Sequence, residues 1–285
     1  MKTVLLVGHI SLDHHGDQVL LGGPPLYQAP VLLANHYEIE VVTSFNPLIG
    51  PRIPEIIVDS IKFITIPSEY TTTFEFIFTE NHQGLHERIL RLKQRAARIN
   101  YEIVKDRLKS KYDVVIISPI ANELDLNDIE SFRILGKKSS IDLQGLIRYF
   151  GESDIATNVR IEENLEWVLN RFDVVKTSGA EIGDFRPKIN YGDAILLITQ
   201  SGNGVEVISE QFTEFIPTTK ISKFVDDTGS GDMFLAGFMI SGQHELRYRE
   251  GIIERINYAD KVARLNLQNK GIPSEEIIKK IKELS

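Results

Sequence analysis

Short apolar runs recur along the chain and alternate with segments whose apolar residues recur at helical spacing. The run from Thr3 to Ile10 is apolar on both faces of an extended chain, which is typical of parallel strands covered by helices. Similar runs lie at 39–44, 61–66, 114–118, 139–143, 173–177 and 194–199, and helical patterns lie at 26–35, 126–136, 162–172, 248–269 and 274–284. This βαβ alternation predicts a doubly wound, mostly parallel α/β sheet with helices on both faces.

Two stretches depart from this rhythm. In residues 71–80, Phe74, Phe76 and Phe78 alternate with other residues, which places three rings on one face of a strand. A turn at 81–84 and a partner strand at 85–92 would complete an antiparallel hairpin, and a second hairpin is expected at 205–216. The first hairpin is either a lid or association surface, or a contribution of phenylalanines to the main core.

Composition bounds the function. The 285 residues contain no cysteine, and 32 basic against 40 acidic residues give a net charge of −8. Disulfides, thiolate metal sites and cysteine nucleophiles are therefore excluded, and nucleic acid or an acidic membrane is not an expected partner. No apolar run is long enough to span a bilayer, and no linker divides the chain. We expect one cytoplasmic domain over residues 1–285.

The stretch from Asp227 to Phe238 holds the most informative chemistry. Gly229, Ser230 and Gly231 lie between the carboxylates of Asp227 and Asp232, and an apolar run follows. Glycines let a ligand approach the backbone closely, and the unpaired amides of a helix start favour an anion. A carboxylate beside an anion site would repel the anion unless the carboxylate has a chemical role. Accepting a proton from an attacking hydroxyl is such a role. Alternatively, Asp227 caps the helix and Asp232 is a solvated first-turn acid.

The polar segment 11–17 reads as a turn above the first strand. With His9 nearby, its two His and two Asp could hold a metal, but the spacing matches no standard ligand pattern. Polar groups that contact a substrate at the carboxyl end of a strand are the alternative we favour. No G-x-G-x-x-G follows the first strand, so a Rossmann dehydrogenase is not supported.

The stretch 227–238 closely resembles the second signature of the ribokinase-like (PfkB) carbohydrate kinases, D-T-G-A-G-D-x-F-x-x-G-F, with Ser230 in place of alanine. Further resemblances follow the family's order: 8–13 resembles its first strand, 22–29 its G-G-x-x-x-N-x-A, 178–181 its N-x-x-E and 199–204 its T-x-G-x-x-G. Tyr27, Ser178 and Ser201 replace the usual Asn, Asn and Gly. The resemblance implies a ribokinase-like fold with a small β-sheet lid inserted at about 16–21 and 71–92.

The resemblance also implies an activity, which is transfer of a phosphoryl group from ATP, with Mg²⁺, to a hydroxyl of a small polyol or sugar. The implied catalytic residues are Asp232 as base with Gly229, Ser230 and Gly231 as anion hole. The implied substrate contacts are Asp13, Gly22, Gly23, Tyr27, Asp142 and Gln144. ATP would contact Ser178, Thr199, Gly202, Gly204, Asp227 and Thr228, and Glu181 would organise the magnesium.

Within the family, the stretches 71–74, 88–91 and 141–148 resemble the inositol kinase branch. Asp142 and Gln144 either face the active site or cap the next helix. A nucleoside kinase of the same fold, in which Tyr27 and Phe74 stack on a base, stays open, as does a non-catalytic nucleotide or sugar binder. A homodimer that pairs through the lid is also expected.

Overall fold

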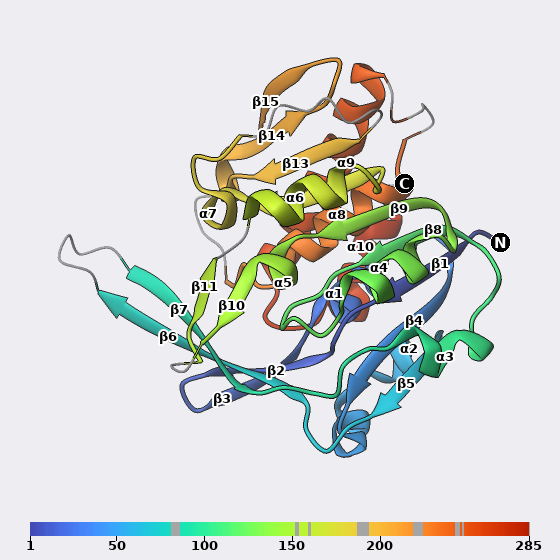
Figure 1. Cartoon of the computed structure of the whole chain (residues 1–285), viewed down its shortest axis with the longest axis vertical. Coiled ribbons are helices and arrows are strands. Elements are labelled where there is room, and N and C mark those ends of the chain that lie inside the picture. Colours follow the sequence, from blue (N-terminus) through green and yellow to red (C-terminus); the bar gives the residue numbers. More distant parts are fainter. Residues whose placement is uncertain are drawn as a thin grey trace.

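The computed structural model of the chain describes residues 1–80, 86–151, 154–158, 161–186, 194–218, 225–242, 246 and 248–284, and only the backbone of 78–80, 86–88, 158 and 161–163. A nine-stranded sheet in the order β15-β14-β13-β12-β9-β8-β1-β4-β5 crosses the molecule (Figure 1). Its strands are β1 (Thr3–Val7), β4 (Glu38–Phe45), β5 (Ile61–Pro67), β8 (Tyr112–Ile117), β9 (Gly136–Asp142), β12 (Val174–Ser178), β13 (Ile195–Thr199), β14 (Gly204–Ile208) and β15 (Thr213–Pro217). β14 pairs antiparallel with β13 and with β15, and the other pairings in this sheet are parallel. The predicted mostly parallel sheet is therefore confirmed.

Helices cover both faces of this sheet, as the two-sided apolar strands predict. Val4 and Leu6 of β1 face a core shared with α1, α8, α9 and α10, whereas Leu5 and Val7 face a core shared with α3, α4 and α6. The helices are α1 (Pro24–Ala34), α2 (Glu55–Val58), α3 (Tyr101–Val104), α4 (Leu126–Arg133), α5 (Gln144–Ile147), α6 (Ile161–Leu169), α7 (Gly179–Ile182), α8 (Ser230–Ile240), α9 (Arg249–Leu267) and α10 (Glu275–Lys282), with 3₁₀ turns at Pro47–Arg52, Lys105–Arg107 and Ser201–Asn203. None in the described ranges is long and apolar enough to cross a membrane.

A second, four-stranded sheet lies beside the main one. Its strands are β2 (Ser11–His15), β3 (Gln18–Gly22), β6 (Thr72–Glu80) and β7 (His86–Gln94), in the order β3-β2-β6-β7. The hairpin of β6 and β7 is confirmed, while the turn predicted at 81–84 lies outside the described residues. The expectation of a turn over 11–17 is wrong for residues 11–15, whereas Gly16 and Asp17 form the turn between β2 and β3. Ser11 to His15 pair with β3 on one side, and Ser11 to His14 pair with β6 on the other, so the polar segment is a strand.

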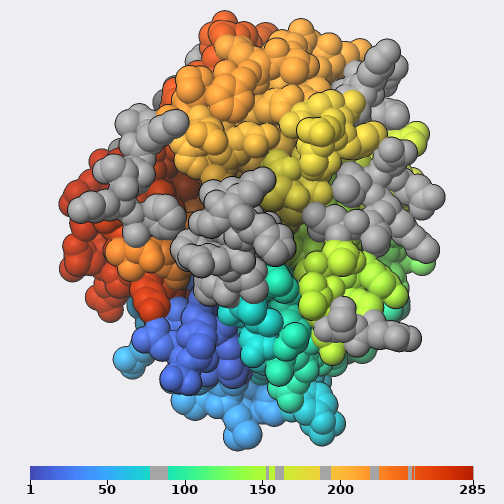
Figure 2. Space-filling model, turned by 90° about the vertical axis from the view of Figure 1, so that its left-hand side faces the viewer, coloured from blue at the N-terminus to red at the C-terminus, as the bar shows by residue number. Residues whose placement is uncertain are grey.

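A short two-stranded sheet, β10 (Arg148–Phe150) and β11 (Ala156–Asn158), adjoins the four-stranded one. The Leu92 amide of β7 donates to the Asp154 carbonyl at 2.8 Å, and Arg91 forms an isolated bridge with Ile155. Figure 2 shows segments that are distant in sequence, coloured blue, teal and green, adjoining on this side of the molecule.

Phe74 and Phe76 of β6 do not fill the main core. Phe74 is buried in a small separate cluster with Leu92, Ile120 and Ala121, and Phe76 packs against that cluster. The Phe78 side chain lies outside the described part of the structure. The hairpin therefore has an apolar face of its own beside the main sheet.

Buried His9 connects the two larger sheets where β1 ends. Its Nε2 donates to the Ala97 carbonyl at 2.9 Å, and its Nδ1 lies 2.7 Å from the Thr72 hydroxyl of β6. The His9 amide donates to Glu123. Within the described ranges, no three His, Cys, Asp or Glu side chains are arranged to hold a metal, so the metal alternative near His9 gains no support.

Candidate active site

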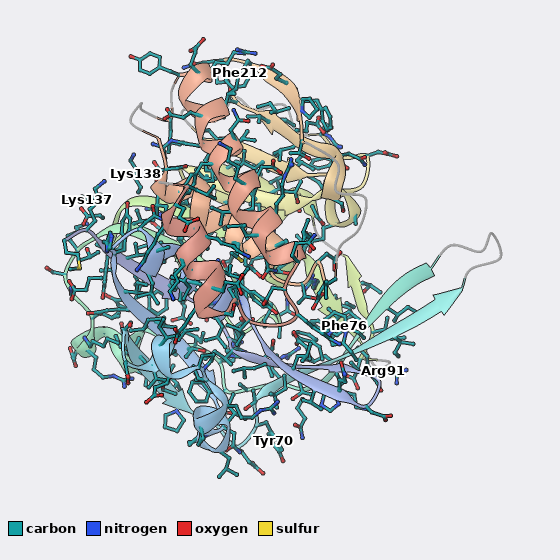
Figure 3. All side chains as sticks on the ribbon, turned by 180° about the vertical axis from the view of Figure 1, so that it is seen from behind. Tyr70, Phe76, Arg91, Lys137, Lys138 and Phe212 are labelled. Carbon is teal, nitrogen blue, oxygen red and sulfur yellow. The ribbon has the colours of Figure 1, made fainter. Side chains whose placement is uncertain are left out.

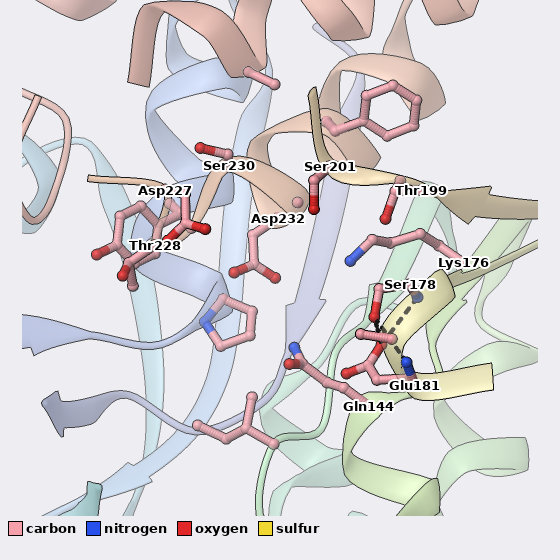
Figure 4. A pocket seen from close by; sticks show the side chains of 18 of the residues that line it. Gln144, Lys176, Ser178, Glu181, Thr199, Ser201, Asp227, Thr228, Ser230 and Asp232 are labelled. Atoms are coloured by element: carbon pink, nitrogen blue, oxygen red, sulfur yellow. Dashed lines mark hydrogen bonds between the residues drawn. The ribbon is translucent and has the colours of Figure 1, made fainter. Parts of the chain in front are cut away.

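A pocket of about 630 Å³ opens at the carboxyl ends of the central strands, between them and the four-stranded sheet. Ligands bind at this edge in open α/β folds, because the loops after parallel strands converge there. Fifteen residues singled out from the sequence line it (Figure 4): Asp13, Gly23, Tyr27, Gln144, Ser178, Glu181, Thr199, Gly202, Gly204, Asp227, Thr228, Gly229, Ser230, Gly231 and Asp232.

The two other residues singled out, Gly22 and Asp142, lie behind the lining. A Cβ on Gly22 would stand 2.3 Å from Asp13 Oδ2, so this glycine makes room for the Asp13 carboxylate. Asp142 is fully buried: its Oδ2 accepts from Lys176 Nζ at 2.6 Å and its Oδ1 accepts from the Gln144 amide at 3.2 Å. Both oxygens of this carboxylate therefore have partners within the protein, and Asp142 does not line the pocket as a substrate contact would. Gln144 does line the pocket.

The start of α8 differs in detail from the expected anion hole. Gly229 is the N-cap residue, with φ +77°, and no side chain caps the helix. The Ser230 amide donates to the Asp227 carbonyl at 3.2 Å, which closes a turn with Gly229 at its positive-φ position. One of the three amides expected to be unpaired is therefore occupied. The alternative in which Asp227 caps α8 is not what the structure has.

The ring of Tyr27, on α1, packs directly under this turn. A Cβ built on Gly229 would lie 2.1 Å from Tyr27 Cδ1, so only glycine fits at that position. Tyr27 is 2% exposed, and burial together with the charge of Asp13 raises the pKa of its hydroxyl far above the usual value. Tyr27 is therefore a neutral support for the turn as well as part of the pocket wall.

Asp232, in the first turn of α8, points into the pocket (Figure 4). Its Oδ1 is inaccessible to solvent and has no hydrogen-bond partner among the described residues. Burial raises the pKa of Asp232 to about 7, against the lowering effect of the Lys176 charge and with a further increase from Asp142. Asp232 is thus not a solvated first-turn acid. A carboxylate of this kind can accept a proton near neutral pH.

If Asp232 is the catalytic base, kcat/KM will depend on the fraction of Asp232 that is deprotonated. The base is the deprotonated form, so kcat/KM should be half-maximal near pH 7 and fall about tenfold per pH unit below it, because kcat/KM reports the free enzyme. The measurement is kcat/KM between pH 5.5 and 9, with melting curves at each pH to separate unfolding from titration. A profile that stays flat down to pH 5.5 would contradict the assignment.

Glu181 lies across the pocket from Asp232, at the start of α7. It forms a capping box with Ser178: the Ser178 amide donates to Glu181 Oε2 at 3.0 Å, and the Glu181 amide donates to the Ser178 hydroxyl at 3.3 Å. The Ser178 hydroxyl also donates to Glu181 Oε2 at 2.8 Å (Figure 4). Glu181 Oε1 pairs with Arg148 at 3.2 Å. Burial would raise the pKa of Glu181, but the charges of Arg148 and Lys176 hold it below its usual range. Glu181 is therefore an ionised carboxylate fixed at the pocket wall.

The expected nucleotide loop lies at the end of β13. Thr199, Gly202 and Gly204 line the pocket, and Ser201 takes φ +49°, a conformation that suits the glycine it replaces. The apolar side chains of Val205, Ala263 and Leu267 line the same pocket. This combination suits a flat apolar group attached to phosphates.

Three basic residues of the pocket went unnoticed in the sequence: Lys176, Arg148 and Arg264. Lys176 lies in a strand that otherwise reads as core, and Arg148 pairs with a residue 33 positions away. Arg264 pairs with Asp260 one turn earlier on α9. A basic residue inside a buried strand pattern is the one signal that could have identified Lys176, since lysine is almost never fully buried unless it is paired.

This two-sheet architecture, with an acid and a glycine turn at the start of a helix, is the ribokinase-like α/β fold expected from the sequence. Residues 162–276 match the model of the pfkB family of carbohydrate kinases. A curated relative, inositol 3-kinase of Arabidopsis thaliana, is 23% identical over 248 residues, which cover 84% of this chain and 67% of that protein. The stretch that matches the family model includes the glycine turn and Asp232.

Solved structures agree on the fold. A pyrophosphate-dependent kinase of the ribokinase family, complexed with a pyrophosphate analog and myo-inositol, superposes with a TM-score of 0.75 at 18% identity, covering 97% of this chain and 99% of that one. Fructokinase with bound ATP from Xylella fastidiosa gives a TM-score of 0.73 at 17% identity, covering 99% and 98%. The fold is therefore the ribokinase fold over nearly the whole chain.

Proposed function

We propose that the protein transfers the γ-phosphoryl group of ATP to a hydroxyl of a small polyol or sugar, with myo-inositol as the first candidate. The single observation on which this rests is Asp232: a partly buried carboxylate, whose Oδ1 is inaccessible to solvent and lacks a partner among the described residues, in the first turn of a glycine-capped helix. The hydroxyl would lie against Asp232 and the phosphoryl group against the amides of the turn.

The acceptor end of the pocket suits a polyol. Ser11 and Asp13 are polar and buried, and the Ser11 hydroxyl donates to Asp13 Oδ1 at 2.9 Å. An ionised carboxylate can accept hydrogen bonds from two or more substrate hydroxyls. Phe74 and Phe76, on the strand paired with that of Asp13, add apolar surface beside it, and the small sheet that carries them would act as the lid that excludes water.

Magnesium would be held mostly by the donor phosphates and water, because magnesium keeps several waters and takes only one or two protein carboxylates. Glu181 fits this role as an ionised carboxylate at the pocket wall, with Ser178 and Arg148 fixing its orientation. The ion would neutralise phosphate charge during transfer. Pairing of two subunits through the small sheet remains part of the proposal.

The donor end favours a nucleotide over pyrophosphate. Val205, Ala263 and Leu267 offer an apolar surface that an adenine ring would cover and that pyrophosphate would leave exposed to water. The pyrophosphate-dependent structural neighbour makes pyrophosphate the donor to test beside ATP.

A nucleoside kinase is the second candidate, supported only by the aromatic residues near the acceptor. Tyr27 is already covered by the glycine turn and Phe74 is 4% exposed, which leaves little ring surface for stacking on a base.

Turnover on myo-inositol, ribose and adenosine, each with ATP or pyrophosphate and with magnesium or a chelator, tests these proposals. We expect transfer from ATP to a cyclitol or sugar that depends on magnesium, detected as phosphate ester by ³¹P NMR. Faster turnover on adenosine would favour the nucleoside kinase, and faster turnover with pyrophosphate would overturn the donor assignment. ATP binding by calorimetry without transfer to any acceptor would indicate a non-catalytic binder.

A further inference from the structure

Lys176 is placed where the transferring phosphoryl group is expected. It lies in β12, is 7% exposed and lines the pocket. A Cβ built on Gly231 would stand 2.8 Å from Lys176 Nζ, so the ammonium lies against the first turn of α8. Figure 4 shows the ammonium of Lys176 and the carboxylate of Asp232 directed into the same part of the pocket.

The buried carboxylate behind Lys176 accounts for this position. Asp142, at the end of the neighbouring strand β9, has no exposed surface, and its Oδ2 lies 2.6 Å from Lys176 Nζ. The backbone register places Lys176 directly beside Asp142. An ammonium has three donors, and Asp142 accepts one in the described structure. The ammonium also borders the pocket and the glycine turn, where its other donors can reach a ligand.

The competing explanation is that Lys176 and Asp142 form an ion pair with a structural role alone. A buried ion pair is weak evidence for stability, because removing two charges from water offsets most of their attraction. Apolar residues would fill this space as well. The pair instead places a positive charge beside a backbone turn that suits an anion, which a structural role does not require.

We propose that Lys176 binds the phosphoryl group during transfer and that Asp142 is a positioning residue that holds Lys176 against the glycine turn. This inference rests on the proposed function and extends its catalytic set. In the reaction, the acceptor hydroxyl oxygen bonds to the γ-phosphorus while the bond from that phosphorus to the bridging oxygen of ADP breaks. The hydroxyl proton passes to Asp232. Lys176 neither gains nor loses a proton; its charge offsets the negative charge on the transferring oxygens.

Asp142 also keeps Lys176 charged. Burial alone would lower the pKa of Lys176, and the charges of Asp142, Asp232 and Glu181 raise it above its usual value. Without Asp142, the ammonium loses its hydrogen-bond partner and the largest of the charge effects that keep it ionised. Asp142 therefore acts through Lys176 and touches no substrate.

The test is a mutant cycle of Lys176→Met, Asp142→Asn and the double variant, measured with the best acceptor and ATP. Lys176→Met should lower kcat about 100- to 1000-fold, the scale for losing one group that stabilises transition-state charge. Asp142→Asn should lower kcat about tenfold or more. The double variant should match Lys176→Met within about twofold, because Asp142 has no effect once Lys176 is gone.

Two results would overturn the inference: a Lys176→Met enzyme within about twofold of the wild type, or a further tenfold loss when Asp142→Asn is added to it. Lys137→Met is the matched control. Lys137 pairs with Asp113 at 2.8 Å but is exposed and lies on the opposite side of the molecule from Phe76 (Figure 3), so kcat should be unchanged. Melting curves identify variants that misfold. If a single variant misfolds, the double variant, which removes both charges of the pair and so restores charge balance, is compared with the wild type instead.

Calorimetry separates failure of this inference from failure of the proposed function. If the wild type phosphorylates no acceptor, the proposed function fails, and binding still decides the role of Lys176. Lys176→Met should weaken ATP binding about tenfold and leave adenosine binding unchanged, since only ATP presents phosphates to the ammonium. Equal losses for ATP and adenosine would assign Lys176 a structural role.

Discussion

Asp232→Asn should lower kcat by about 100- to 10,000-fold, the range for losing a general base, and leave ATP binding within about twofold of the wild type. Asparagine preserves the shape of the side chain at the start of α8 but cannot accept the hydroxyl proton. Steady-state kinetics with the best acceptor, together with ATP calorimetry, measure both effects. A variant with near-normal turnover would contradict the assignment.

The same substitution should make the protein more stable above neutral pH. The folded-state pKa of Asp232, about 7, lies above the unfolded value of about 3.9. The folded state therefore retains a proton that the unfolded state loses, and ionisation of Asp232 reduces the free energy of unfolding as pH rises from about 4 through 7. Asparagine carries no such cost, so the variant should melt at a higher temperature than the wild type at pH 8.

Asp128→Asn is the matched control for both measurements. Asp128 is also buried, burial likewise raises the pKa of its carboxyl, and Oδ1 accepts from the Tyr101 amide at 2.8 Å. It lies in α4 and does not line the pocket. Turnover should be unchanged in this variant. A similar loss of turnover in both variants would mean that the effect of Asp232→Asn is not specific to the site.

Gly229→Ala should reduce kcat by about 100-fold or more. The new Cβ would lie 2.1 Å from the Tyr27 ring, so the turn, the ring or both must move by about an ångström, and a displacement of that size near the reacting groups can cost about 100-fold in rate. The positive φ of +77° adds strain of about 1 kcal/mol for a residue with a Cβ. Kinetics and melting curves of the purified variant measure the two effects separately.

Gly271→Ala separates the effect of backbone strain from the effect of a steric clash such as that between residue 229 and Tyr27. Gly271 has nearly the same φ, +72°, but a Cβ there would meet nothing within 4 Å. It should show a small loss of stability and normal turnover. If Gly229→Ala behaves in the same way, the contact between the turn and Tyr27 does not control catalysis.

The sequence predicted the main sheet well because its strands are buried on both faces. Runs such as 114–118 are apolar throughout, and no amphipathic alternative competes with that pattern. The glycine turn at 227–232 was predictable for a different reason, since only glycine tolerates the conformation at Gly229 and the close contact with Tyr27.

What the sequence did not predict depends on long-range pairing. Ser11 to His15 look like a polar loop because one face of β2 lines a pocket, and they form a central strand of the small sheet by pairing with β3 on one side and with β6, about 60 residues later, on the other. Lys176 and Asp142 lie 34 residues apart and become partners only when β12 and β9 pair. Neither separation leaves a local signal in the chain.

The two hydrogen bonds of the His9 ring, which connect the two larger sheets, determine which ring nitrogen carries the proton. Because a carbonyl can only accept, His9 Nε2 must carry the proton toward Ala97, and Nδ1 must then accept from the Thr72 hydroxyl. Burial lowers the pKa of His9, which favours the neutral ring with its proton on Nε2. The connection between the two sheets therefore relies on a neutral imidazole whose two hydrogen bonds have fixed directions.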